Sequence, residues 1–90
     1  MTQGEYRVGI HFNPSEDNAV DRLKQKAAAF IDECQAQLNA LYPNGVGSLE
    51  VVPEWRLRAE KHSLYDRAMR EAEGAAMWGV KAATKRAMDA

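Results

Sequence analysis

Two aromatic rings and several cations gather near the start of the chain, where Tyr6 and Phe12 flank Arg7. Rings can stack on a nucleobase while neighbouring cations pair with its phosphates, so this mixture suits a nucleotide-like ligand. The residues alone favour a more ordinary arrangement, in which the cations lie on a solvated helix face and the rings pack on the core. The cations that follow along the chain are Arg22, Lys24 and Lys26.

A second set of cations lies towards the end of the chain, at Arg67, Arg70 and Lys81. Arg70 and Lys81 are 11 residues apart, which is about three helical turns, so they share one side of a helix. Opposed copies of such a helix could line a polar pocket across an oligomer axis.

Residues typical of catalysis or metal binding are present but poorly spaced. His11, His62 and Cys34 lack paired spacing such as CxxC or HxxxH, and the 13 carboxylates are scattered. The turn at 45–47 has two glycines but no phosphate-binding lysine. We therefore expect no catalytic residue, no metal and no cofactor, and a binding protein rather than an enzyme.

The length and charge of the chain narrow its class. Ninety residues predict a single domain over 1–90. With 12 basic and 13 acidic residues, the net charge of −1 gives no DNA-binding or membrane-binding signature. No apolar run approaches the ~18–20 residues of a membrane span, and a single cysteine fits a reducing compartment. We expect a cytoplasmic protein with no DNA and no membrane partner.

Alternating apolar residues predict an extended N-terminal arm over 1–14, with Tyr6, Val8, Ile10 and Phe12 on one side. A first helix is then expected over about 16–41. Its N-cap would be Ser15, with Asn18 as a rival. Charged and amide residues, Lys24 among them, should take its polar side. The residues expected on its apolar face are Val20, Leu23, Ala27, Phe30, Ile31, Cys34, Leu38 and Leu41.

A turn-rich connection is expected over 42–62, followed by a second helix over about 63–88. That helix could begin after a break near Ser63 or run continuously from Pro53. The predicted fold is all-α: an antiparallel two-helix hairpin with an extended N-terminal arm.

The second helix has more apolar circumference than one packing partner can cover. Met77, Val80 and Ala76 form a strip beside a face of small residues, and Trp78 projects from a third side. We therefore expect a homo-oligomer. The small residues that recur at three- and four-residue steps are Ala68, Ala72, Ala75, Gly79, Ala82 and Ala83.

Three segments, taken together, resemble one family. They are Tyr6-Arg7 through Phe12-Asn13-Pro14, the run from Val20 to Asp32, and the run from Arg70 to Lys85. These segments resemble the helical-hairpin domain of phage anti-CBASS and anti-Thoeris proteins, which are small nucleotide sponges. The last segment is the most specific.

The resemblance implies a homo-oligomer, often a hexamer, in the cytoplasm of an infected bacterial host. It implies capture of a cyclic oligonucleotide or cyclic ADP-ribose-type signal without cleavage. In this family an N-terminal aromatic residue and a lysine of the first helix hold the ligand. Lys24 matches the lysine, and Tyr6 matches the aromatic residue with Phe12 as a rival. A second pocket would use Arg70 or Lys81, and the neighbouring candidates are Arg7, Asn13 and Lys26.

The residues also allow a different class of function. Trp78 and the methionine-rich side of the second helix could bind a protein partner, which would make the chain a structural or regulatory adaptor. Hydrolysis of the same messenger fits less well, because the chain offers neither an HxT-type pair nor a metal cluster.

Overall fold

A computed structural model describes residues 1–45 and 54–88, and the described residues form three helices and no strand. The helices are α1 (Gln3–Val8), α2 (Asn18–Ala40) and α3 (Trp55–Thr84). The prediction of an all-α protein is confirmed. None of these helices combines the length and apolar character that crossing a membrane requires.

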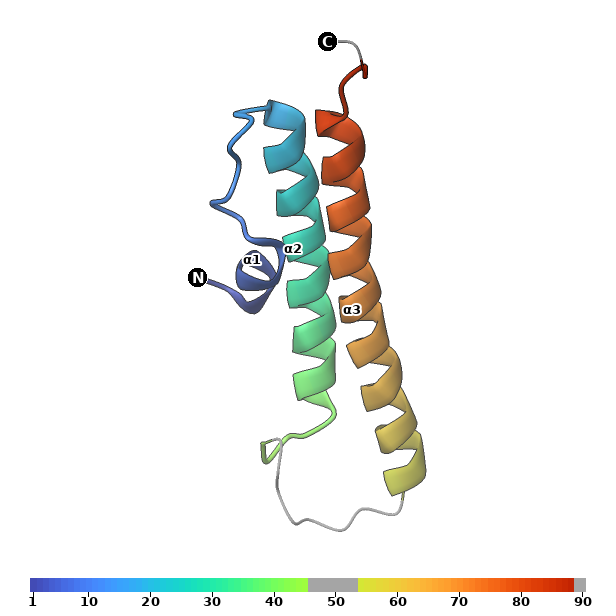
Figure 1. The fold of residues 1–90 in the computed structure, drawn as a ribbon. Helices are drawn as coiled ribbons and strands as arrows, with labels where there is room; N and C mark the ends of the chain where they lie inside the picture. The colour runs from blue at the N-terminus through green and yellow to red at the C-terminus, as the bar shows by residue number, and fades with distance from the viewer. Residues whose placement is uncertain (46–53, 89–90) are drawn as a thin grey trace.

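The two long helices lie side by side and run in opposite directions, and α1 packs across the middle of α2 (Figure 1). The molecule is a rod with principal extents of 61 × 23 × 15 Å. Its radius of gyration is 16.9 Å, whereas a compact domain of this length has about 12 Å. Such an elongated shape leaves much apolar surface uncovered by the chain itself.

The extended arm predicted over 1–14 is wrong, because residues 3–8 are helical. Thr2 and Glu5 form a capping box: the Thr2 side chain accepts from the Glu5 N–H, and the Thr2 N–H donates to the Glu5 carboxylate. Hydrogen bonding of the Glu5 carboxylate to the backbone and the side chain of Thr2 lowers the pKa of Glu5. Gly9 then ends the helix in the left-handed conformation. The Thr-x-x-Glu signal outweighs the alternation that follows it.

A close approach of backbones docks α1 on α2. A Cβ atom on Gly4 would lie 2.1 Å from the carbonyl oxygen of Ala28, so only glycine allows this contact. The Gly4 N–H donates to a carboxylate oxygen of Asp32 over 2.7 Å. Because this N–H belongs to the first turn of α1, it has no partner within its own helix.

The start of α2 and its buried face differ from the prediction. Asp17 caps the helix through the Ala19 N–H, so neither Ser15 nor Asn18 is the N-cap. Leu23 and Phe30, expected in the core, are exposed, and Phe30 keeps 52% of its surface accessible. The buried residues of α2 are Val20, Lys24, Ala28, Ile31, Cys34 and Leu38. The buried face is shifted because α2 is covered by α1 as well as by α3.

The second long helix is continuous from Trp55 to Thr84. The predicted break near Ser63 is therefore wrong, and the predicted connection over 42–62 is shorter, because residues 55–62 belong to α3. The proposed start at Pro53 lies outside the described residues. The helix ends at Thr84 rather than near residue 88, because Lys85 is extended.

The small-residue face of α3 packs within the chain at more than one point: Ala68 and Ala72 lie against the central core, and Gly79 lies against α2. A Cβ atom on Gly79 would lie 3.4 Å from the methyl carbons of Leu23, so α3 meets α2 there. The central core lies further along the pair, where Met69 of α3 packs with Ile31, Cys34 and Leu38. By contrast, Ala75 and Ala82 are exposed.

An apolar face of the helix pair has no cover from the described chain. Leu57, Leu64 and Trp78 are exposed and recur on α3 at multiples of seven residues, which keeps them on one side. Leu23 and Phe30 of α2 adjoin them through the contact of Leu23 with Gly79. Around the axis of α2, the direction of Phe30 differs by about 200° from that of Ala28, the residue that contacts α1. The apolar face therefore lies on the side of α2 opposite α1.

Replacing Gly4 tests the docking of α1. We expect Gly4→Ala to lower the thermal midpoint, because its Cβ would overlap the Ala28 carbonyl. Gly74→Ala is the matched control: nothing lies within 4 Å of its Cβ position, and alanine should stabilise α3 by about 0.5–1 kcal/mol. Equal midpoints for the two variants in thermal unfolding would contradict the packing of α1.

Candidate functional site

A groove lies between the α1 segment and the C-terminal half of α3, with Lys24 of α2 among its walls. Its volume is about 420 Å³, within the range of small-molecule sites and large enough for a nucleobase with its phosphate. The residues lining it are Tyr6, Arg7, Val8, Gly9, Phe12, Lys24, Glu73, Ala76, Met77 and Val80.

The ammonium group of Lys24 is the central charge of the groove. Lys24 was expected on the polar side of its helix, but it is only 6% exposed. Its Nζ donates to the carbonyl of Gly9 over 2.9 Å and to the carbonyl of Phe12. An ammonium has three donors, so one is left. No carboxylate of the described residues pairs with Lys24, and its positive charge is therefore not neutralised.

The turn after α1 brings those two carbonyls to Lys24. Gly9 has a φ of 61°, which L-residues with side chains rarely adopt, and its N–H returns to the carbonyls of Glu5 and Tyr6. The Phe12 N–H donates to the Gly9 carbonyl over 2.9 Å and closes the turn. The carbonyls of Gly9 and Phe12 can then face the same ammonium.

The aromatic rings beside Lys24 remain open to ligands. Tyr6 and Phe12 are 74% and 71% exposed, so they do not pack on the core as the ordinary alternative supposed. Lys24 Nζ lies 5.5 Å from the centre of the Phe12 ring. An exposed ring next to a buried cation can stack on a base while the cation binds its phosphate.

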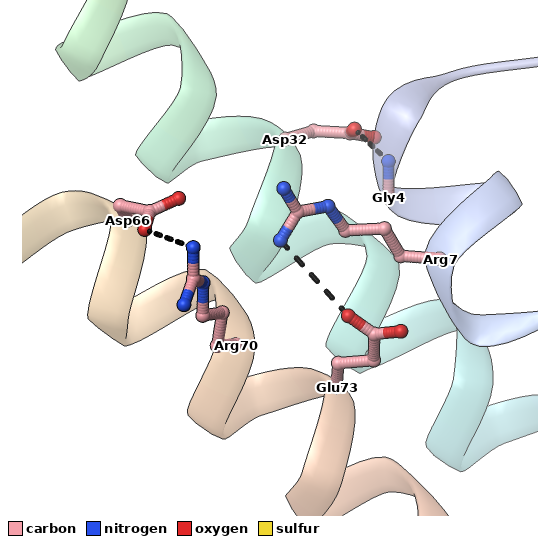
Figure 2. A network of polar contacts seen from close by, with 6 residues as sticks. All are labelled: Gly4, Arg7, Asp32, Asp66, Arg70 and Glu73. Carbon is pink, nitrogen blue, oxygen red and sulfur yellow. Dashed lines mark hydrogen bonds and ion pairs between the residues drawn. The ribbon is translucent and has the colours of Figure 1, made fainter.

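A loose ion pair lies at another part of the groove. Arg7 of α1 reaches towards Glu73 of α3, with 4.0 Å between Nη1 and the nearest carboxylate oxygen (Figure 2). This distance is too long for a hydrogen bond. The two side chains are 21% and 46% exposed, so both groups keep hydrogen-bonding capacity for a ligand.

Four predicted site residues therefore meet in one groove: Tyr6, Arg7, Phe12 and Lys24. Whether they bind a ligand stays a prediction. Two other predicted residues near the N-terminus lie outside it. Asn13 donates to the backbone of Asp17 and the carboxylate of Asp21, and so orders the start of α2. Lys26 is exposed and borders a separate, shallow hollow.

The two predicted cations of α3 also lie outside the groove. Arg70 pairs with Asp66 one helical turn earlier, at 3.0 Å (Figure 2). Lys81 is exposed, and its Nζ lies 5.4 Å from the ring centre of Trp78.

Sequence reasoning missed Glu73 as a groove residue. The strip predicted from Ala76, Met77 and Val80 forms the α3 wall, and Glu73 lies three residues before its first member. The spacing 73, 76, 77, 80 is that of one helix face, so periodicity could have found it. The charge of Glu73 set it apart from an otherwise apolar strip.

The histidines and the cysteine do not gather around the groove. The Tyr42 hydroxyl is hydrogen-bonded to Nδ1 of His62, and His11 is exposed. Among the residues that the structure describes, no three histidine, cysteine or acidic side chains come together as metal ligands would. Burial, with a smaller effect from Glu33, raises the pKa of the Cys34 thiol.

Removing the Lys24 ammonium tests its role in holding the turn. We expect Lys24→Met to lower the free energy of unfolding by about 1–3 kcal/mol in urea titration, because the Phe12 carbonyl loses its donor. The control Lys26→Met, at an exposed site without such bonds, should change it by less than about 0.5 kcal/mol. A Lys24 variant as stable as the control would refute this role.

Thiol labelling tests the environment of Cys34. Because the raised pKa keeps the thiol protonated near neutral pH, labelling by a disulfide reagent should be slow and should follow unfolding of the chain. The Gly4→Ala variant should then be labelled faster. Immediate labelling of the folded protein would show that Cys34 is accessible.

Comparison with known proteins adds no relative. No family model and no curated protein matches the sequence, and no solved structure matches the chain. The resemblance to phage nucleotide sponges therefore rests on its three sequence segments, and the function is argued from the groove.

Proposed function

We propose that the protein binds and sequesters a cyclic nucleotide messenger of bacterial anti-phage defence without cleaving it. The single observation that carries the proposal is the buried, unneutralised ammonium of Lys24 in one groove with the exposed rings of Tyr6 and Phe12. The resemblance supplies the class of ligand, a cyclic oligonucleotide or a cyclic ADP-ribose-type signal. The groove supplies the physical means of holding it.

Each part of a nucleotide has a partner in the groove. The remaining donor of Lys24 would bind a phosphate oxygen in a charge-assisted hydrogen bond. Stacking of a base on Tyr6 or Phe12 would contribute about 1–3 kcal/mol per base. Met77, which is also exposed, would cover the apolar side of the base.

The lining of the groove supports capture rather than turnover. It contains no histidine, cysteine or serine among the described residues, and its one carboxylate is Glu73. Sequestration needs none of these groups, because it lowers the concentration of free messenger by binding alone.

We also propose that copies of this helix pair assemble into a homo-oligomer, a hexamer as the resemblance implies. The chain exposes 6946 Å², whereas a typical monomer of this mass exposes about 5300 Å². The face formed by Leu23, Phe30, Leu57, Leu64 and Trp78 would be buried between copies. Because this face is opposite α1, assembly through it leaves the groove open.

A protein partner is the second candidate for that face. Trp78 is exposed, and aromatic residues are enriched in protein interfaces. An adaptor of this kind would bind its partner on the side opposite the groove and would be indifferent to nucleotides.

Calorimetry against cyclic di- and trinucleotides and cyclic ADP-ribose derivatives tests the proposed capture. At least one should bind, and denaturation should release it intact. Tyr6→Ala combined with Phe12→Ala should weaken binding by about tenfold or more, because two stacking surfaces are lost. Trp55→Ala removes another exposed ring, far from the groove, and is the control.

Two results would contradict the proposal. Absence of binding to the whole panel would exclude nucleotide capture, and conversion of the ligand over time would show an enzyme. If the double variant bound as tightly as Trp55→Ala, the site would lie elsewhere on the molecule.

A further inference from the structure

We infer that Glu73 reads the base of the captured nucleotide and makes the groove prefer guanine to adenine. The inference rests on the proposed nucleotide capture and adds to it the class of base. It starts from a groove carboxylate whose long ion pair with Arg7 leaves its oxygens able to accept hydrogen bonds.

Glu73 makes little contact with other polar groups of the folded chain. Its only polar contact with a described residue is the ion pair with Arg7, and at 4.0 Å that pair is not a hydrogen bond. With the side chain half-exposed, both carboxylate oxygens are free to accept hydrogen bonds. Glu71, another exposed carboxylate of α3, differs: it is hydrogen-bonded to Arg67 over 3.0 Å, outside the groove.

A negative charge in an anion-binding groove demands a reason. Glu73 and Lys24 line the same groove, so the carboxylate opposes the charge of any phosphate bound there. Arg7, 4.0 Å away, offsets part of this opposition, and N–H donors of the ligand turned towards Glu73 would offset the rest. The phosphate of a nucleotide would then bind to Lys24, and the edge of its base would bind to Glu73.

The nucleobases differ in the donors that they offer to a carboxylate. Guanine presents two adjacent donors, N1–H and the N2 amino group, which match two carboxylate oxygens. Adenine presents one amino group beside the N1 lone pair, and that lone pair would face a negatively charged oxygen. Repulsion of the wrong base adds to attraction of the right one, which is how charged groups give specificity.

Cyclic di-GMP and cyclic di-AMP are the probes, because they differ in the base alone. We expect calorimetry of the wild-type protein to show cyclic di-GMP binding about tenfold tighter or more, as hydrogen bonds to a charged group allow. Glu73→Gln keeps the shape of the side chain but replaces one acceptor with a donor. This variant should reduce the preference to within about twofold.

Glu71→Gln is the matched control, with the same change on the same helix but outside the groove, and it should keep the wild-type preference. Equal binding of the two probes by the wild-type protein, tighter binding of cyclic di-AMP, or a preference that survives Glu73→Gln would each overturn the role of Glu73. Nucleotide capture itself would stand in those cases. If the wild-type protein bound no cyclic nucleotide at all, both proposals would be wrong.

Discussion

The structure around the groove depends on one buried ammonium group. Lys24 holds the carbonyls of Gly9 and Phe12, and through them it sets where the chain turns after α1. The same turn presents the exposed ring of Phe12, and α1 presents that of Tyr6. A charge with only carbonyl partners is costly to bury, and an anionic ligand would offset that cost. Stability of the turn and the proposed affinity for an anion would thus come from the same atom.

The short helix α1 is the second requirement for this arrangement. Six residues are too few for a helix to persist alone in water, so α1 depends on its capping box and on its contact with α2. Gly4 allows that contact and Asp32 receives its N–H. Arg7 is thereby placed opposite Glu73, which connects α1 with α3 across the groove.

The two faces of the helix pair have different proposed roles. One face carries α1 and the groove, and the other presents apolar side chains of α2 and α3 to solvent. Because two helices and one short segment cannot enclose a large core, the rod exposes more surface than a compact domain. Burial of the second face by other copies would stabilise the rod without obstructing the ligand.

The sequence by itself determined the all-α class, because long helical periodicities dominate it. It placed α2 within two residues at its start and one at its end, and it identified the strip of Ala76, Met77 and Val80. The sequence also identified four residues of the groove, by their chemistry and by a resemblance: Tyr6, Arg7, Phe12 and Lys24. Local patterns suffice for such features, because a short stretch of sequence shows both its helical periodicity and its residue types.

Only the tertiary structure decided that Lys24 is buried and that Glu73 faces the groove. Periodicity assigns a lysine to solvent. It does not show that two carbonyls 12 and 15 residues earlier accept hydrogen bonds from the Lys24 ammonium. It also placed Leu23 and Phe30 in the core, because periodicity does not show that Leu23 stays partly exposed at its contact with α3 or that Phe30 faces solvent. These outcomes depend on which surfaces three helices bring together, and that information lies in long-range packing.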